Sequence, residues 1–149
     1  MDFKTAIYTC LRPKYANFSD RASISEFWWF VLFYITSIIG IGSIGLLIAV
    51  SLDSMGLYGS AYHVFVIAPI ILWVLFLIIP IIAVNVRRFH DIDMTGWWFL
   101  LFYLLQCIPL INLIAFVVNI VLFCKPGSEG PNRFGNSPFA IDDYQETFK

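Results

Sequence analysis

The side chains best suited to chemistry gather in one stretch of this 149-residue sequence, at residues 85–98. The stretch holds two arginines, one histidine and two aspartates: Arg87, Arg88, His90, Asp91 and Asp93. Imidazole and carboxylate groups are the usual proton carriers and metal ligands of proteins, and guanidinium groups bind phosphate in a bidentate manner. Metal binding, acid–base catalysis and phosphate binding are therefore the three chemistries to weigh.

The sequence lacks the additional residues that a metal site or a catalytic site would need. A zinc site takes three or four ligands, and the apolar pattern places the only other histidine, His63, on the opposite membrane face. The three cysteines form no Cys-x-x-Cys pair and are expected to be packing residues. A phosphohydrolase of the His-Asp type would need further histidines and aspartates. We predict no metal, no cofactor and no catalytic residue, and expect Asp91 to orient His90 or to pair with a neighbouring arginine.

The elements that must position these side chains are hydrophobic. The chain is 60% hydrophobic and 13% charged, about half the charged fraction of a typical soluble domain. Residues 27–52, 61–86 and 96–123 contain no Asp, Glu, Lys or Arg, and each run exceeds the roughly 20 residues that cross a bilayer as a helix. Tryptophan pairs typical of membrane interfaces open the first and third runs: Trp28, Trp29, Trp97 and Trp98. The sequence predicts an all-α integral membrane protein, and its net charge of −1 gives no reason to expect nucleic acid.

Two of the apolar runs contain helix-breaking residues. Pro69 and Pro80 lie on one side of the second helix and predict a bend. As a straight helix, the third run would be about 40 Å long, whereas the hydrocarbon core is roughly 30 Å thick. Its middle is interrupted at residues 106–109. The third run can tilt, kink or return as a re-entrant hairpin, and these alternatives stay open.

Polar segments flank the runs. Apolar residues at helical spacing before Pro13 predict a short amphipathic helix, within a cytoplasmic or interfacial segment at residues 1–26. A second polar connection is predicted at residues 87–95. Glycine and proline residues predict an irregular C-terminal segment at residues 124–149, ending in a solvated tail.

Lysine and arginine positions predict the orientation. Four of them precede the first run, namely Lys4, Arg12, Lys14 and Arg21; none lies at residues 53–60, and two follow the second run. Because cytoplasmic loops are enriched in these residues, the N-terminus and residues 87–95 are predicted to be cytoplasmic. A third crossing would export Lys125 and Arg133, whereas a hairpin would keep them inside. The side of the C-terminus is left open.

Four sequence blocks, in order, follow a family pattern. The pattern consists of Arg-Ala-Ser-Arg-x-Glu-Phe-Trp, Arg-Arg-Leu-His-Asp, Gly-Trp-Trp and Gly-x-x-Gly-x-Asn-Arg-Tyr-Gly. Residues 21–28 read Arg-Ala-Ser-Ile-Ser-Glu-Phe-Trp, and residues 87–91 read Arg-Arg-Phe-His-Asp. Residues 96–98 read Gly-Trp-Trp, and residues 127–135 read Gly-Ser-Glu-Gly-Pro-Asn-Arg-Phe-Gly. The chain thus resembles the DUF805 family of small bacterial membrane proteins over residues 18–138.

The resemblance implies a multi-pass protein of a bacterial inner membrane and supplies no reaction. Three positions depart from the pattern. Asp20 replaces a usual glycine, Ile24 a basic residue, and Phe134 a tyrosine. These departures weaken any role that needs the extra positive charge or the phenol.

The blocks predict one interfacial polar cluster if the C-terminus also faces inward. Its candidate members are Arg21, Glu26, Arg87, Arg88, His90, Asp91, Asn132 and Arg133. We expect Glu26 to form a buried pair with an arginine. The hypothesis for function is a structural or interaction component that binds a membrane protein, a second copy of itself or anionic lipid. An oligomeric channel or transporter accessory is the alternative, and an enzyme acting on lipid headgroups is the third.

Overall fold

The computed structural model describes residues 1–56 and 63–138. Within them the chain is helical, and its only β feature is an isolated bridge between Asn132 and Gly135. The elements are α1 (Phe3–Leu11), α2 (Ile24–Ser54), the π-helix η1 (His63–Ile67), α3 (Ala68–Asp91), α4 (Trp97–Gln106) and α5 (Ile111–Cys124).

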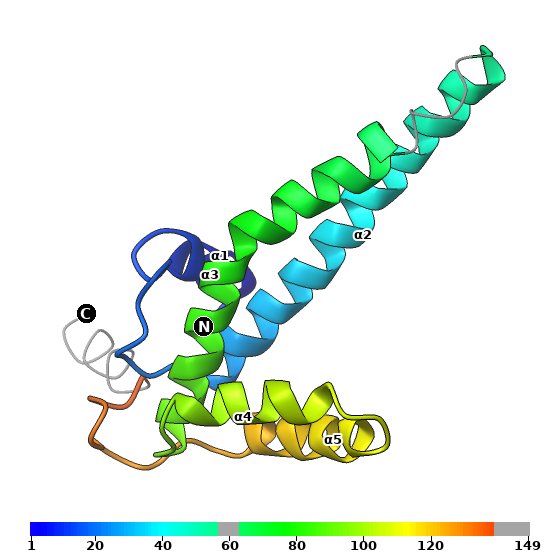
Figure 1. Ribbon diagram of the computed structural model, residues 1–149. Coiled ribbons are helices and arrows are strands. Elements are labelled where there is room, and N and C mark those ends of the chain that lie inside the picture. Colours follow the sequence, from blue (N-terminus) through cyan, green and yellow to red (C-terminus); the bar gives the residue numbers. More distant parts are fainter. Residues whose placement is uncertain (57–62, 139–149) are drawn as a thin grey trace, which may run out of the picture.

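Helices α2 and α3 form a long antiparallel pair (Figure 1). Directly before α3, η1 approaches α2 closely at Gly45, where a Cβ atom would lie 2.0 Å from the carbonyl oxygen of Phe65. Nearer the other end, the indole nitrogen of Trp73 donates to the hydroxyl of Ser37 at 2.8 Å. Small residues on one face of α2 therefore serve contacts within the chain, because only a short side chain allows such an approach.

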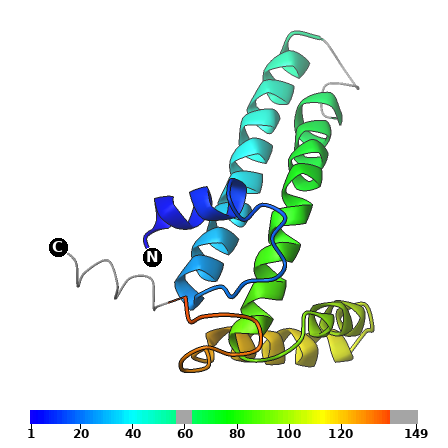
Figure 2. The ribbon, with the colours of Figure 1, turned by 90° about the vertical axis from the view of Figure 1, so that its left-hand side faces the viewer.

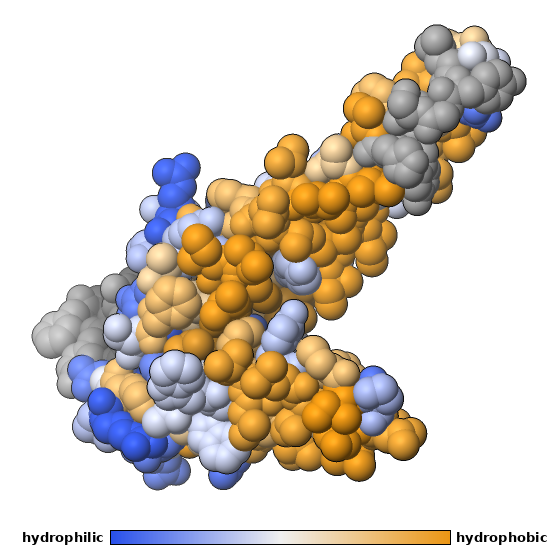
Figure 3. Space-filling model, in the orientation of Figure 1, coloured by the Kyte–Doolittle hydropathy of each residue, from blue (hydrophilic) through white to orange (hydrophobic). Residues whose placement is uncertain are grey.

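The outer surfaces of this pair are apolar and exposed. Ile24–Ser54 and Val64–Asp91 are long and apolar enough to cross a membrane, yet only 6% and 17% of their most apolar windows are buried inside the protein. Figure 3 shows apolar side chains covering both α2–α3 and the α4–α5 region, with polar residues gathered at one end. Such surfaces need a lipid solvent. The predicted fold class, an all-α integral membrane protein, is confirmed.

Helix α3 bends part-way along its length (Figure 1). Pro80 lies inside the helix, as predicted for a bend, whereas Pro69 lies in the first turn of α3, directly after η1. Proline is tolerated in a first turn, so only Pro80 interrupts the helical hydrogen bonds of α3.

The third apolar run is a hairpin of two short antiparallel helices. Helices α4 and α5 pack side by side and are joined at residues 107–110, where Leu110 has a φ of 71°. At 1.5 Å per residue they are about 15 Å and 21 Å long, so neither spans a core of roughly 30 Å. The hairpin returns the chain to the end of the α2–α3 pair from which it left (Figure 2). Of the three predicted alternatives, the structure has the hairpin.

Helix α1 lies across α2 (Figure 2). Its Ala6 and Cys10 are buried, while Phe3 packs edge-on against Trp29 at 5.6 Å between ring centroids. The carboxylate of Asp2 caps its first turn by accepting from the backbone N–H of Thr5. One buried side and one exposed side agree with the amphipathic pattern of the sequence.

Two predicted boundaries differ from the structure. Helix α2 begins at Ile24, earlier than residue 27, because Ser23 accepts from the N–H of Glu26 as an N-cap. Helix α3 continues to Asp91, so residues 87–91 lie in its last turns and only residues 92–96 connect it to α4. Residues 139–149, which include the predicted tail, and half of the predicted connection at 53–60, namely residues 57–60, lie outside the described residues.

Candidate functional site

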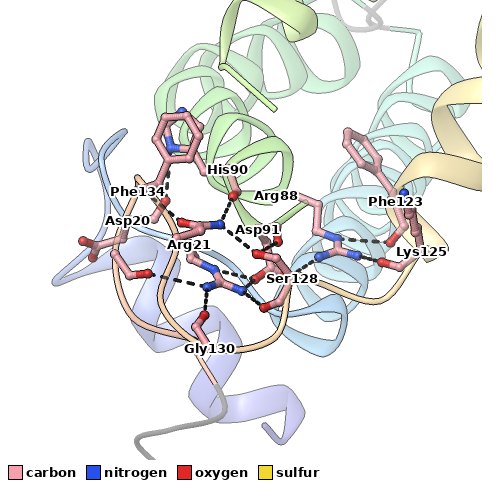
Figure 4. A network of polar contacts seen from close by, with 12 residues as sticks. Asp20, Arg21, Arg88, His90, Asp91, Phe123, Lys125, Ser128, Gly130 and Phe134 are labelled. Atoms are coloured by element: carbon pink, nitrogen blue, oxygen red, sulfur yellow. Dashed lines mark hydrogen bonds and ion pairs between the residues drawn. The ribbon is translucent and has the colours of Figure 1, made fainter. Parts of the chain in front are cut away.

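Asp91 is the centre of a buried charge cluster (Figure 4). One carboxylate oxygen accepts from Arg21 at 2.9 Å, and the other is paired with Arg88, three residues earlier on α3. The Asp91 side chain is fully buried, as are the two arginines to within 1%. Helix α3 therefore carries the carboxylate and one arginine, Arg88. The segment before α2 supplies the second arginine, Arg21.

The remaining N–H groups of both arginines bind the C-terminal segment. Arg21 donates to the carbonyl oxygens of Gly130 and Ser128, each at 2.7 Å. Arg88 donates to the carbonyls of Phe123, at 3.1 Å, and Lys125. Because a guanidinium group has five donors in a fixed plane, one side chain can hold a carboxylate and several carbonyls together. The arginines thereby fasten residues 123–130 to the end of α3.

Gly127 allows this segment to approach Asp91. A Cβ atom at residue 127 would lie 2.2 Å from a carboxylate oxygen of Asp91. The next residue, Ser128, donates its backbone N–H to the carbonyl of Asp91 at 2.8 Å. The backbone of the C-terminal segment therefore contacts Asp91 directly, and it can do so because Gly127 has no side chain.

A second buried pair joins α2 to α3. Glu26 is paired with Arg87, and both side chains are buried to within 2%. The thiol of Cys10 lies 3.6 Å from each of them, so α1 also contacts this pair. Burial raises the pKa of the Cys10 thiol to about 12, and the negative charge of Glu26 acts in the same direction. Cys10 is therefore a neutral thiol, not a nucleophile.

His90 is fixed by ring stacking and by polar contacts of its ring and its carbonyl. Its ring stacks on Phe134 with centroids 3.9 Å apart and planes within 2° of parallel. Its Nδ1 lies 3.3 Å from the carbonyl oxygen of Asp20, and its own carbonyl accepts from the amide of Asn132. Stacking needs only a flat ring, so the phenylalanine at 134 provides it without a phenol.

An outer ion pair closes the site. Arg133 pairs with Asp93 at 3.1 Å, and both side chains are more than half exposed. Arg133 also donates to the backbone carbonyl of Asp93 at 2.6 Å. Asp93 has a φ of 59°, a conformation that aspartate tolerates better than most residues. This pair adds a solvent-exposed link between the α3–α4 connection and the C-terminal segment.

The buried cluster carries one positive charge in excess, since three arginines face two carboxylates. Backbone carbonyl dipoles satisfy much of that excess. Separating such charges from water costs several kcal/mol per ion unless every group is paired. The Nε of Arg87 is the one buried arginine nitrogen without a partner in the described part of the chain.

The arrangement brings together all eight predicted cluster residues. Asp91 does not orient the imidazole of His90; it pairs with Arg88 and Arg21 instead. Within residues 1–56 and 63–138, no group of three or more His, Cys, Asp or Glu side chains could hold a metal ion. The tryptophan pairs lie outside the cluster, Trp28 and Trp29 on α2 and Trp97 and Trp98 on α4.

Sequence reasoning missed the backbone acceptors and two small residues. The carbonyls of Phe123, Lys125, Ser128 and Gly130 carry no sequence signal, because every residue has a carbonyl. Cys10 was expected only as a packing residue. Gly127 could have been found from its place in the fourth sequence block, where the family pattern has a glycine.

The chain is similar to known bacterial inner membrane proteins. Residues 15–136 match the family model described as "Protein of unknown function (DUF805)". The chain belongs to the DUF805 family. It is similar to "Inner membrane protein YhaI" of Escherichia coli K12, with 32% identity over 88% of this chain and 93% of the relative. It is also similar to "Inner membrane protein YhaH" of the same strain, with 31% identity over 88% of this chain and 94% of the relative. No solved structure matches it.

The DUF805 match spans the whole charge cluster. Arg21 and Glu26 come from the first block of the family pattern, Arg87 to Asp91 from the second, and Asn132 with Arg133 from the last. The third block, residues 96–98, starts α4 directly after the cluster. In this DUF805 protein, blocks far apart in sequence therefore meet at one end of the helix pair.

Proposed function

We propose that this DUF805 protein is an interaction component of a bacterial inner membrane that binds anionic lipid at its polar end, without catalysing a reaction. We call this end the polar cap and define it as residues 1–23, 87–96 and 125–138. The observation that carries the proposal is that the Asp91 carboxylate is buried and fully paired. Both its oxygens are held by buried arginines, and those arginines hold the backbone of a third segment.

A catalytic acid or base must be accessible to a substrate, and the buried side chains of the cluster are not. The Asp91 side chain is fully buried, and His90 is stacked under Phe134 with its Nδ1 toward Asp20. Breaking such contacts in each turnover would leave buried arginines without their counter-charge, at a cost of several kcal/mol. The cluster is therefore better suited to hold the polar cap rigid than to react.

The surface of the polar cap favours anionic lipid. Lys4, Arg12 and Lys125 are exposed there, at the same end as the buried excess of positive charge. Basic residues beside a membrane gain about 1 kcal/mol each from anionic lipid headgroups. Together with the placement of the cap beside the apolar helices, these charges support lipid binding over catalysis.

The proposal includes the orientation. Residues 1–23 and residues 125–138 contact each other through Arg21 and Gly130, so they lie on the same side of the membrane. The positive residues of the cap favour the cytoplasmic side. We therefore propose that the N-terminus, the cluster and the C-terminal segment lie together on the cytoplasmic face.

Lipid preference in nanodiscs tests the proposal. The purified protein is titrated with phosphatidylglycerol and with phosphatidylcholine, and bound lipid is counted by native mass spectrometry. We expect a preference for phosphatidylglycerol that falls by about tenfold or more in the triple variant Lys4→Glu, Arg12→Glu, Lys125→Glu, because three charges are reversed. The matched control, Lys4→Arg, Arg12→Lys, Lys125→Arg, should keep it. Equal binding of both lipids by the native protein would overturn the proposal.

A further inference from the structure

The starting observation is a groove on the outer face of α2. Ile24, Ser25, Trp28, Trp29 and Leu32 line a space of about 510 Å³, with almost wholly apolar walls. The residues lie at the beginning of the first span, where the tryptophan pair predicts the membrane interface. Phe3 of α1 packs on Trp29 and fixes that side of the groove. The groove is open to the surroundings and has the apolar lining of a site for a hydrocarbon chain.

A second, polar pocket adjoins the groove. It has a volume of about 340 Å³, and its walls include the cations Lys14 and Arg21, the carboxylates Asp20 and Glu26, and residues 134–138. The hydroxyl of Ser23, on the polar side, lies 3.1 Å from that of Ser25, which lines the groove. The backbone nitrogen of Met1, also in the polar wall, lies 3.4 Å from the same Ser25 hydroxyl. The two spaces therefore share a border of hydroxyl groups.

The polar pocket is electrostatically suited to an anion. Arg21 is 97% buried and its N–H groups are bonded to Asp91, Ser128 and Gly130, so it acts on the pocket through its charge, as part of the cluster that carries one positive charge in excess. The ammonium of Lys14 lies at the wall with its side chain 28% exposed, 3.3 Å from the carboxylate of Asp20. Asp20 is nearly half exposed, so its pair with Lys14 is weak and leaves the ammonium able to turn toward a bound anion. A phosphodiester offers the geometry and charge that such groups bind.

We propose that one anionic phospholipid binds across this border, with its phosphate in the polar pocket beside Lys14 and Arg21 and an acyl chain in the groove along Trp28 and Leu32. This inference rests on the proposed function and names its site. The combination selects a lipid over a free phosphate, because half of the site is hydrocarbon-lined. It also favours an anionic lipid over a zwitterionic one, because the ammonium of Lys14 lines the polar half and the buried cluster beside it carries one positive charge in excess.

Filling the groove tests the proposal without touching the charge cluster. In Leu32→Trp, at a side chain that is 45% exposed, the larger ring occupies the groove; in the control, Leu47→Trp, the same change lies further along α2 on an exposed side chain. Native mass spectrometry of the full chain with phosphatidylglycerol should show binding weakened by about tenfold in Leu32→Trp, the effect of losing contact with about two methylene groups. Leu47→Trp should stay within about twofold of the native protein.

The head of the site is tested separately at Lys14. Lys14→Gln should weaken phosphatidylglycerol binding several-fold and leave phosphatidylcholine binding unchanged, and Lys14→Arg should restore the preference. Soluble glycerol phosphate should not compete with the lipid. Competition by glycerol phosphate, or equal effects of Leu32→Trp and Leu47→Trp, would overturn this site while leaving the proposed function standing. Absence of any anionic preference in the native protein would overturn both.

Discussion

The hydroxyl of Tyr15 donates a hydrogen bond to the backbone carbonyl oxygen of Phe76 at 2.6 Å. Phe76 lies four residues before Pro80, which has no N–H to give, so this carbonyl loses its helical partner. The loop after α1 thus provides the donor that the bent helix lacks. The contact also ties the N-terminal segment to the side of α3, well away from the charge cluster.

Removing the Tyr15 hydroxyl should lower stability only when the Phe76 carbonyl has no other hydrogen-bond donor. We expect Tyr15→Phe to lower the free energy of unfolding in detergent by about 1–2 kcal/mol, since a carbonyl is left unpaired. In a Pro80→Ala background the helix recovers its N–H donor, and the same change should cost markedly less. Chemical unfolding followed by circular dichroism measures the cycle. Equal costs in both backgrounds would show that Tyr15 does not act through this carbonyl.

Asp91→Asn should be severely destabilising. The change leaves Arg21 and Arg88 buried without their carboxylate, a situation that costs about 3–5 kcal/mol. Asp93→Asn is the matched control, because Asp93 pairs with Arg133 at the surface and should cost less than about 1 kcal/mol. Thermal unfolding in detergent compares the two variants. Similar melting temperatures would contradict the assignment of Asp91 as the centre of the cluster.

Gly127→Ala should detach the C-terminal segment from α3. Its Cβ would lie 2.2 Å from the Asp91 carboxylate, whereas a Cβ at Gly40 meets nothing within 4 Å. We expect a loss of about 1–3 kcal/mol for Gly127→Ala, typical of overpacking, and little change for Gly40→Ala. Limited proteolysis at residues 125–138 reports the detachment directly. Equal protection in both variants would mean that the segment tolerates the added methyl group.

The Cys10 thiol should resist alkylation at neutral pH. Burial and Glu26 raise its pKa to about 12, from an ordinary 9.0, so the reactive thiolate is scarce. In a Cys107→Ala, Cys124→Ala background, maleimide labelling at pH 8 should be much slower in the folded protein than in denaturant. The raised pKa also means that the stability contribution of the thiol is complete below pH 9.0 and is lost as pH rises toward 12. Fast labelling of the folded protein at pH 8 would refute this.

Both ends of the chain should be on the cytoplasmic side. The bond between Arg21 and Gly130 requires the N-terminal and C-terminal segments to share one side, and the positive residues favour the inside. A C-terminal green fluorescent protein fusion should therefore fluoresce, and a C-terminal alkaline phosphatase fusion should be inactive. The opposite pattern would mean that residues 97–124 cross the membrane and that the cluster cannot form as described.

Much of the fold could be read from apolar run lengths. Residues 27–52 and 61–86 predicted the two long helices, and the interruption at 106–109 predicted the break that separates α4 from α5. The helix ends were less predictable, because Ser23 caps α2 earlier and α3 continues through charged residues to Asp91. The apolar pattern of a sequence shows where lipid contact ends. A helix ends where its backbone hydrogen bonds end, and the two positions need not coincide.

The sequence predicted which residues form the candidate site, but not which of them form ion pairs and hydrogen bonds with one another. The charged blocks indicated Arg21, Glu26 and Asp91 as members of one cluster, which Asn132 and Arg133 would join if the C-terminus faced inward. The pairing of Asp91 with Arg21, 70 residues away, and the use of Ser128 and Gly130 carbonyls could not be derived. Arginines and carboxylates combine in several ways at the same sequence spacing, and only distances in space select one.

Composition and hydropathy were enough to predict that this protein is embedded in a membrane, that its helices are apolar on the outside, and that its charged residues lie between the apolar runs. Its composition decides this, because so few charged residues cannot solvate the surface in water. The hairpin of α4 and α5 and the closure of the C-terminal segment over Asp91 depend instead on tertiary contacts. Hydropathy gives the solvent that each segment prefers, but the direction after a turn depends on contacts such as Gly127 against Asp91, which form between residues distant in the chain.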